Sequence, residues 1–300
     1  MNAASRTTDA DTLALLGTKG GPAIRPGSAM PTSNLLTLGG QRIVVDCGLG
    51  VTHGLVDQGM ALEDLSLIFV THLHSDHYLE LGALLHTAWT AGLTTPVTVY
   101  GPDGLERYWQ TFLAAMDADI ALRIADEGRP DLSSLVRVLT LDAGEVRDVA
   151  GLEVSAIRTV HPPLVETFAL AFAVAVAGTR VVFSGDTAPS PAFVEFARDA
   201  DLLVHEAMLE AALPALFERV GNGDDRLRAH WMRSHTLAHD AARTATDAGV
   251  RALALNHLIP SDDPDWTEDH WREAVAPHYD GVLHIGHDGM VIPLGATTGA

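Results

Sequence analysis

The sequence predicts a single α/β domain, and three observations support this prediction. Short apolar runs typical of buried strands alternate with segments that have the spacing of amphipathic helices. No stretch between them has the polar or Pro/Gly-rich composition of a linker, although 300 residues exceed the usual domain size. A hydrophobic fraction of 47% is enough for a sizeable core. We therefore expect one domain over residues 11–295, preceded by a flexible N-terminal tail at residues 1–10.

The first third of the chain is predicted to begin with antiparallel strands. Two strand-like runs, LALLGTKGGP and SNLLTLGGQRIVVDCGLG, are interrupted by paired glycines, which indicates a hairpin with tight turns. A short helix and turn follow over GLVDQGMALEDL, and a strand is expected at 65–70. Residues 79–92 have helical apolar spacing and end at Gly92, which serves as a C-cap. The strand PVTVYG completes this part.

The rest of the chain is predicted to be a helical insertion followed by β-rich segments. Residues 103–135 are helical and more polar, with a Gly-Arg-Pro break, so we expect them to protrude; whether they border a site stays open. Strand-like segments then continue as far as LLVHEAM. TLAHDAARTATDAG is a predicted helix with Thr236 as N-cap and Gly249 at its end, and the strand RALALNHL follows it.

Composition and charge argue against several classes of function. No apolar run approaches the roughly 20 residues that span a bilayer, and the N-terminus lacks the apolar stretch of a secretory signal. The single cysteine, Cys47, cannot form an internal disulfide, which agrees with a reducing compartment. A formal net charge of −20 repels polyanions. We therefore expect a cytoplasmic protein without a membrane or nucleic-acid partner.

Four apolar strands end in side chains of the kinds that bind metal ions. In α/β proteins the carboxyl ends of strands converge, so residues that are remote in sequence can meet there. Imidazole and carboxylate without thiolate suit Zn²⁺, with Mn²⁺ or Fe²⁺ as alternatives, and the set is too large for one tetrahedral ion. The sequence therefore predicts two metal ions. The candidate ligands are His72, His74, Asp76, His77, His161, Asp186 and His257.

The motif HxHxDH, found here in THLHSDH at 71–77, resembles that of the metallo-β-lactamase superfamily of metallohydrolases. The order of motifs matches from Leu13 to Leu294, and the resemblance implies a four-layer αβ/βα sandwich, the metallo-β-lactamase fold. It further implies which ligands belong together: His72, His74 and His161 at the first metal, Asp76, His77 and His257 at the second, and Asp186 bridging both. Asp46 matches the early strand-end aspartate that supports the metal loop, and GTKGGP matches a loop at the rim of the site.

A pair of divalent ions would define the chemistry. Two such ions about 3.5 to 4 Å apart lower the pKa of a bridging water and clamp the electrophile's oxygen. Asp76 can also orient the resulting hydroxide. The expected activity is that of a dinuclear metal-dependent hydrolase that uses a metal-bridging hydroxide.

Two further residues resemble the branch that contains ribonuclease Z and the related arylsulfatases. Glu206 in LLVHEAM and His235 in RSHTLAHDAA match its glutamate and histidine pair. A carboxylate beside a histidine raises its pKa and favours the imidazolium, so His235 is the expected general acid. Met208 departs from the threonine usual in the ribonuclease branch. The segment between His161 and Asp186 leaves no room for the arm with which bacterial ribonuclease Z grips tRNA.

The substrate is predicted to be a small anion. Arg226, Arg228 and Arg233 could hold a sulfate or phosphate ester, and Trp231 could form an apolar wall, although a solvated loop fits these residues equally well. The preferred function is hydrolysis of a small phosphodiester or sulfate ester by two Zn²⁺. The alternatives are a ribonuclease Z-type tRNA 3′-processing endonuclease and a lactonase or thioesterase. A redox di-iron protein is disfavoured because that branch has Glu where His74 stands. The oligomeric state stays open, and the resemblance leaves room for a homodimer, since relatives are commonly dimers.

Overall fold

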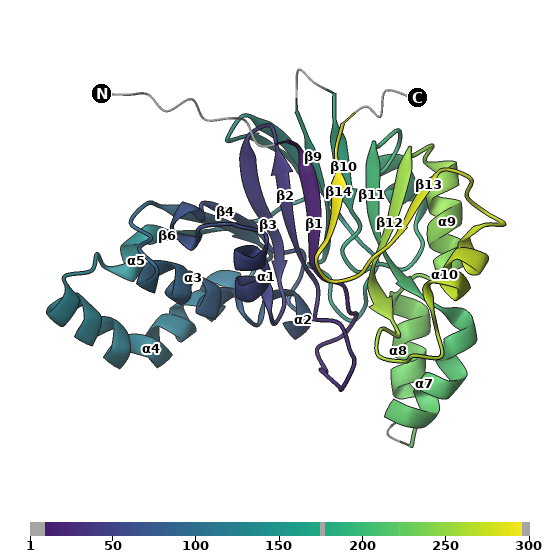
Figure 1. Cartoon of the computed structure of the whole chain (residues 1–300), viewed down its shortest axis with the longest axis horizontal. Coiled ribbons are helices and arrows are strands. Elements are labelled where there is room, and N and C mark those ends of the chain that lie inside the picture. The colour runs from purple at the N-terminus through teal and green to yellow at the C-terminus, as the bar shows by residue number, and fades with distance from the viewer. Residues whose placement is uncertain (1–9, 175–177, 222, 296–300) are drawn as a thin grey trace.

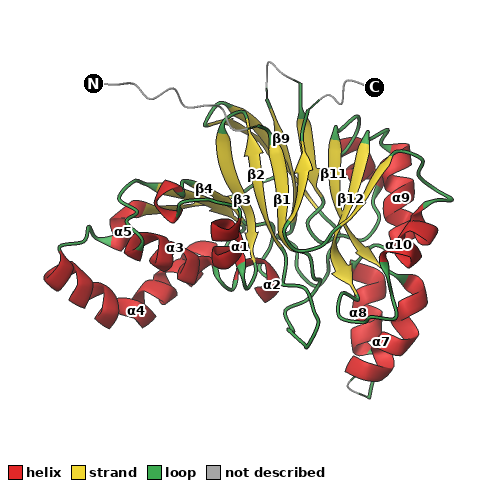
Figure 2. Cartoon of the chain, viewed as in Figure 1, coloured by secondary structure: helices red, strands yellow, loops and turns green. Residues whose placement is uncertain are grey.

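Two seven-stranded sheets stack against each other, with helices on both outer sides (Figure 1 and Figure 2). The computed structural model describes residues 10–174, 178–221 and 223–295. Residues 1–9 of the expected N-terminal tail lie outside the described residues. Within the described part, no helix is both long and apolar enough to cross a membrane.

The first sheet comes from the N-terminal half of the chain and receives its edge strand from the C-terminus. Its antiparallel part contains the tight hairpin predicted at Gly39 and Gly40, and its strands from β3 onward run parallel. The tight turn predicted at GTKGGP was wrong, because β1 and β2 are joined by a loop over residues 18–32. In spatial order the strands are β14 (Met290–Pro293), β1 (Thr12–Gly17), β2 (Ser33–Leu38), β3 (Gln41–Cys47), β4 (Leu67–Phe69), β5 (Val97–Gly101) and β6 (Val136–Thr140).

The second sheet is built from the C-terminal half. Strands β7 to β10 form an antiparallel meander, and β10 to β13 run parallel. In spatial order the strands are β13 (Val282–Ile285), β12 (Ala252–Ile259), β11 (Leu202–Met208), β10 (Arg180–Phe183), β9 (Phe168–Ala173), β8 (Leu152–Arg158) and β7 (Gly144–Val149).

Helices cover the outer face of each sheet. The first sheet carries α1 (Val51–Asp57), α3 (Leu81–Thr90), α4 (Leu105–Glu127) and α5 (Leu132–Leu135), and the second carries α6 (Pro191–Phe196), α9 (Ala238–Asp247) and α10 (Glu268–Val275). Three short helices lie toward the lower end in Figure 1: α2 (Ser75–Tyr78), α7 (Leu213–Val220) and α8 (Arg226–Ser234).

Both faces of the central strands are buried, which explains why they read as continuous apolar runs. In β3, Val44 faces the helices, whereas Ile43 and Val45 face the opposite sheet. In β11, Leu203 faces the helices and Val204 faces the opposite sheet. Three apolar cores therefore separate four layers. The predicted four-layer αβ/βα sandwich is confirmed.

The helical segment at 103–135 consists of α4 and α5, separated by the Gly-Arg-Pro break. Trp109 is buried in the core beneath the first sheet, whereas Leu122 is 65% exposed. Much of α4 extends beyond the sheet, on the left in Figure 1.

The prediction that Thr236 caps a helix was wrong. The N-cap of α9 is Leu237, because the Thr236 hydroxyl donates instead to the carbonyl of Thr187 at 2.6 Å. The C-terminal end agrees with the prediction: α9 stops at Asp247, and Gly249 follows with φ 66°.

Candidate metal centre

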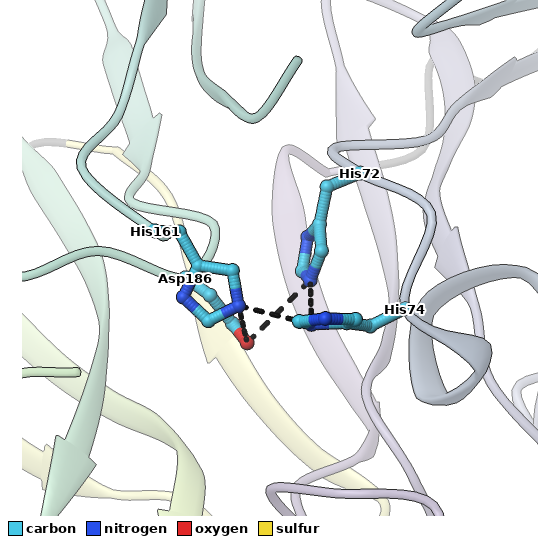
Figure 3. A group of neighbouring side chains, drawn as sticks. All are labelled: His72, His74, His161 and Asp186. Atoms are coloured by element: carbon cyan, nitrogen blue, oxygen red, sulfur yellow. Dashed lines mark hydrogen bonds and ion pairs between the residues drawn. The ribbon is translucent and has the colours of Figure 1, made fainter. Parts of the chain in front are cut away.

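The seven candidate ligands lie together where the parallel strands of the two sheets end. The segment after β4 supplies two histidines and α2 supplies an aspartate and a histidine, while the second sheet supplies the other three. Figure 3 shows His72 and His74 pointing from one half of the chain toward His161 and Asp186 from the other. The centre therefore lies between the two halves of the fold.

The first cluster has the spacing of a tetrahedral cation site. His74 Nδ1 lies 3.2 Å from His72 Nε2 and 2.9 Å from His161 Nε2. Asp186 Oδ2 lies 3.6 Å from His72 Nε2 and 3.7 Å from His161 Nε2. Ligands at 2.0 to 2.1 Å from a tetrahedral Zn²⁺ lie about 3.3 Å from one another. The four side chains therefore fit one cation.

The second cluster shares Asp186 with the first. His257 Nε2 lies 3.3 Å from Asp186 Oδ2 and 3.4 Å from Asp76 Oδ2. His77 Nε2 lies 3.4 Å from Asp186 Oδ1 and 3.7 Å from Asp76 Oδ2. Because Asp186 contributes oxygens to both clusters, its position is that of a bridging ligand.

Hydrogen bonds behind the rings determine which nitrogens face the centre. The Thr71 hydroxyl donates to the Asp46 carboxylate, with both oxygens 3.0 to 3.1 Å away, and can therefore accept the Nδ1–H of His72 at 3.1 Å. Asp46 also accepts the Nδ1–H of His77 at 2.8 Å. His72 then presents an unprotonated Nε2, and His77 directs its own Nε2 to the centre. Burial opposes a charge on His77, but the carboxylates of Asp186, Asp46 and Asp76 outweigh it and raise its pKa well above the usual value, and a cation bound there would displace that proton. Asp46 adopts φ 64°, a strained conformation of the kind found at functional sites.

His161 is fixed in the same way. Its Nδ1–H donates to the carbonyl of Ser234 at 2.8 Å, so Nε2 faces the cluster. Burial lowers the pKa of His161 to about 4 and holds the pKa of His72 well below its usual value. These histidines are neutral at physiological pH, which is the form that binds a cation.

Several buried polar atoms at this centre have no hydrogen-bond partner among the described residues. They are His77 Nε2, Asp186 Oδ1 and both ring nitrogens of His257. Buried polar atoms in native proteins are normally satisfied, and coordinated cations would satisfy His77 Nε2, Asp186 Oδ1 and His257 Nε2, whereas His257 Nδ1 lies on the side of Glu206. The donor set of imidazole and carboxylate therefore fits two divalent cations.

His235 and Glu206 form a hydrogen-bonded pair beside the clusters. The Nδ1–H of His235 donates to Glu206 Oε2 at 2.7 Å, and Glu206 Oε1 accepts the backbone N–H of Thr187 at 2.5 Å. Burial opposes the charge on His235, but the adjacent Glu206 carboxylate outweighs it and raises the pKa of His235 to about 9. The pair therefore holds an imidazolium at neutral pH.

A cavity of about 250 Å³ opens onto the clusters. Its polar lining includes Asp76, Asp186, His235 and His257, and α8 contributes Leu227, His230 and Trp231 to its wall. Residues Gly20, Gly21 and Pro22 of the loop after β1 close another side. The cavity thus combines the candidate metal centre with an apolar and aromatic wall.

The three arginines near His235 lie apart from this cavity and are absent from the described residues that line it. Arg226 is largely exposed and pairs with Asp224, and the guanidinium of Arg228 lies over the ring of Phe217 at 5.7 Å. Arg233 lies exposed on α8. Of the predicted substrate-binding residues, the structure places only Trp231 at the cavity.

Sequence reasoning missed His230 and the close approach of Gly20. His230 precedes His235 by five residues, and its ring centroid lies 5.7 Å from that of His235 and 5.8 Å from that of His161. A Cβ on Gly20 would lie 2.8 Å from His257 Nδ1, so only glycine fits there. The glycine pair in GTKGGP was the signal that could have indicated the close approach of Gly20. The spacing of five residues between His230 and His235 was the signal that could have indicated His230.

Comparison with known proteins places this centre in a family. The family model described as "Anti-Pycsar protein Apyc1" matches residues 12–251. Ribonuclease Z of Mycobacterium bovis (strain BCG / Pasteur 1173P2) is 32% identical over 280 residues, which cover 92% of this chain and 95% of the relative. The chain belongs to the metallo-β-lactamase-fold family that includes ribonuclease Z and Apyc1.

Solved structures of metallo-β-lactamase-fold proteins share its architecture. YhfI from Bacillus subtilis has a TM-score of 0.69 and 19% identity, with 95% of this chain and 100% of that chain covered. The short form of human tRNase Z has a TM-score of 0.66 and 20% identity, again covering 95% of this chain and 100% of that chain. These structures agree with the fold, and the family match confirms the predicted family: the chain is a metal-dependent hydrolase of the metallo-β-lactamase and ribonuclease Z family with a His/Asp cluster.

Proposed function

We propose that this protein hydrolyses a small phosphodiester or sulfate ester with two Zn²⁺ ions. The observation that carries the proposal is the convergence of two cation clusters, joined by Asp186, on a cavity that also contains the His235–Glu206 pair. The phosphodiester is preferred because the curated relatives are named ribonucleases.

The charge at the centre favours an anionic ester. With cations bound to their nitrogens, the five imidazoles of the clusters would be neutral, whereas Asp76 and Asp186 carry one negative charge each, and the buried Asp46 adds a third. Two divalent cations would carry four positive charges against the three negative charges of these carboxylates, which leaves a net charge of +1 before a hydroxide binds, in spite of the protein's formal charge of −20. A centre of this charge attracts an anion and repels a cation.

The residues around the metal centre have separate roles in the proposed reaction. Bound cations of this kind supply a hydroxide nucleophile near neutral pH and polarise the oxygens of the ester. The Nδ1 of His235 is occupied by Glu206, so its Nε2 is the nitrogen available to substrate, and we assign it the proton for the leaving alkoxide. Trp231 and Leu227 supply an apolar wall for the ester's organic group.

Metal analysis combined with a panel of chromogenic esters tests the proposal. The panel contains a phosphodiester, a phosphate monoester, a sulfate ester, a lactone and a thioester. We expect two zinc ions per chain and fastest turnover of the phosphodiester. A protein that binds no metal, or one that prefers the lactone or thioester, would overturn the assignment.

A ribonuclease Z-type tRNA 3′-processing endonuclease is the second candidate, and the 32% identity to ribonuclease Z over 92% of the chain favours it. Against it, β9 and β10 pair directly, with Arg180 opposite Ala173, so this connection has no room for a projecting arm. A gel assay with precursor tRNA distinguishes the two. Absence of cleavage at high enzyme concentration would eliminate the endonuclease.

A further inference from the structure

Lys19 is the single lysine of the chain, and it lies buried at the rim of the metal centre. Its side-chain ammonium donates to the carbonyl of Gly20 at 2.6 Å, and only 6% of the residue is exposed. Burial of an ammonium is energetically costly unless the group has a partner. A buried lysine at this position is therefore a candidate for a specific function.

The hydrogen bonds of this segment join Lys19 to a candidate metal ligand through a single peptide group. The carbonyl of Gly20 accepts from the lysine, and the N–H of the same peptide, carried by Gly21, donates to Asp76 Oδ2 at 2.8 Å. An amide that accepts a proton from a cation becomes a stronger N–H donor, because resonance couples its oxygen to its nitrogen. The two hydrogen bonds therefore strengthen each other.

The backbone on either side of this peptide is held in place. Gly20 N–H donates to the carbonyl of Leu258 at 3.1 Å, and Lys19 N–H donates to the carbonyl of Met30 at 2.9 Å. Gly21 itself has φ 81°, a conformation that glycine adopts readily. Between two glycines the peptide has conformational freedom, and the ammonium is the contact that holds its oxygen on one side.

Neighbouring charges do not account for Lys19. Asp262 is the acidic group with the largest electrostatic influence on Lys19, but that carboxylate already pairs with Arg219 at 3.0 Å and Arg25 at 3.5 Å. The hydrogen bond to Gly20 is thus the contact that distinguishes Lys19 from the two arginines.

We propose that Lys19 is a positioning residue that orients Asp76 for the second cation through the Gly20–Gly21 peptide. This inference rests on the metal centre of the proposed function but not on its substrate. Partners that orient a metal ligand from behind typically change metal affinity 10- to 100-fold when removed. A merely nearby positive charge has the opposite effect, because its removal makes cation binding tighter.

The test compares Lys19→Met with Arg25→Met in zinc-free protein titrated with Zn²⁺ against a chromophoric chelator. Lys19→Met removes the donor to Gly20, whereas Arg25→Met removes a positive charge from the same surroundings and leaves the peptide untouched. We expect about 10- to 100-fold weaker binding of the second zinc ion in Lys19→Met alone. Unchanged or tighter binding in that variant would overturn the inference.

A measurement on the unaltered protein covers the case in which Lys19→Met fails to fold. Because the chain has one lysine, ¹³C-lysine labelling gives one side-chain signal in an NMR spectrum. We expect this signal to shift with the cation that binds Asp76. A signal that does not change when either equivalent of Zn²⁺ is added would refute the link between Lys19 and Asp76. Protein that binds fewer than two ions would refute the proposed metal centre itself.

Discussion

Replacement of His235 by asparagine separates proton donation from structure. Alanine would leave the buried Glu206 carboxylate without its imidazole partner, and loss of one partner of a buried charge pair costs about 3 to 5 kcal/mol of stability. In His235→Asn, the side-chain amide takes the place of Nδ1–H and can still donate to Glu206. It has no nitrogen in the position of Nε2 and cannot supply a proton.

The expected loss depends on the leaving group. General acid catalysis typically contributes 10²- to 10⁴-fold, or about 3 to 5 kcal/mol of transition-state stabilisation. A phosphodiester with an alkyl leaving group needs that proton and should lose this full factor in kcat. A p-nitrophenyl phosphodiester departs as a stable phenolate without a proton, so its loss should be less than about tenfold on the same scale.

The assay measures kcat for both substrates in the wild type and in His235→Asn, with zinc content determined in parallel. Two zinc ions per chain should remain in the variant, because we assign His235 to neither cation. Equal losses for the two leaving groups would refute proton donation by His235. An unchanged kcat with the alkyl ester would remove the residue from the mechanism altogether.

Three further predictions concern cation binding and stability. Free Zn²⁺ at a thousand times its Kd adds about 4 kcal/mol per ion to the free energy of unfolding, which raises the Tm of a 300-residue chain by roughly 6 °C per ion. Calorimetry with and without a chelator measures this shift. An unchanged Tm would contradict the metal centre. Gly20→Ala places a Cβ 2.8 Å from His257 Nδ1 and 2.5 Å from Ile259 Cγ1, so it should weaken the second zinc ion and leave the first intact; two unaltered affinities in the titration would show that the loop yields. Burial lowers the pKa of His205 to about 4, below its ordinary 6.5, so the unfolded chain takes up the proton first and stability falls as pH drops from 6.5 to 4. Between pH 7.5 and pH 5 this effect of His205 lowers the free energy of unfolding by about 2 kcal/mol. Urea unfolding at the two pH values should show that His205→Asn abolishes this loss and that a control substitution of the exposed His53 does not.

Much of the fold could be predicted because both sheets leave local signals. The apolar runs that end in VTHLHSDH, VVFSGD and LALNH reflect strands buried on both faces, and the paired glycines Gly39 and Gly40 mark the tight hairpin. The cap of α9 could not be predicted, because the hydroxyl of Thr236 is taken by Thr187, a residue 49 positions away. Local propensity gives way when a distant partner satisfies the same group.

The sequence by itself determined the kinds of ligand and the family, because HxHxDH is contiguous and each remaining ligand lies within three residues of the end of an apolar strand. Tertiary structure alone decided what surrounds those ligands. It placed His230 and Trp231 at the cavity and Arg226 and Arg228 outside it, since the direction of a side chain on α8 depends on how that helix packs. It also brought the Gly20–Gly21 peptide to Asp76, 55 positions along the chain, because hydrogen bonds between distant backbone segments leave no pattern in the sequence.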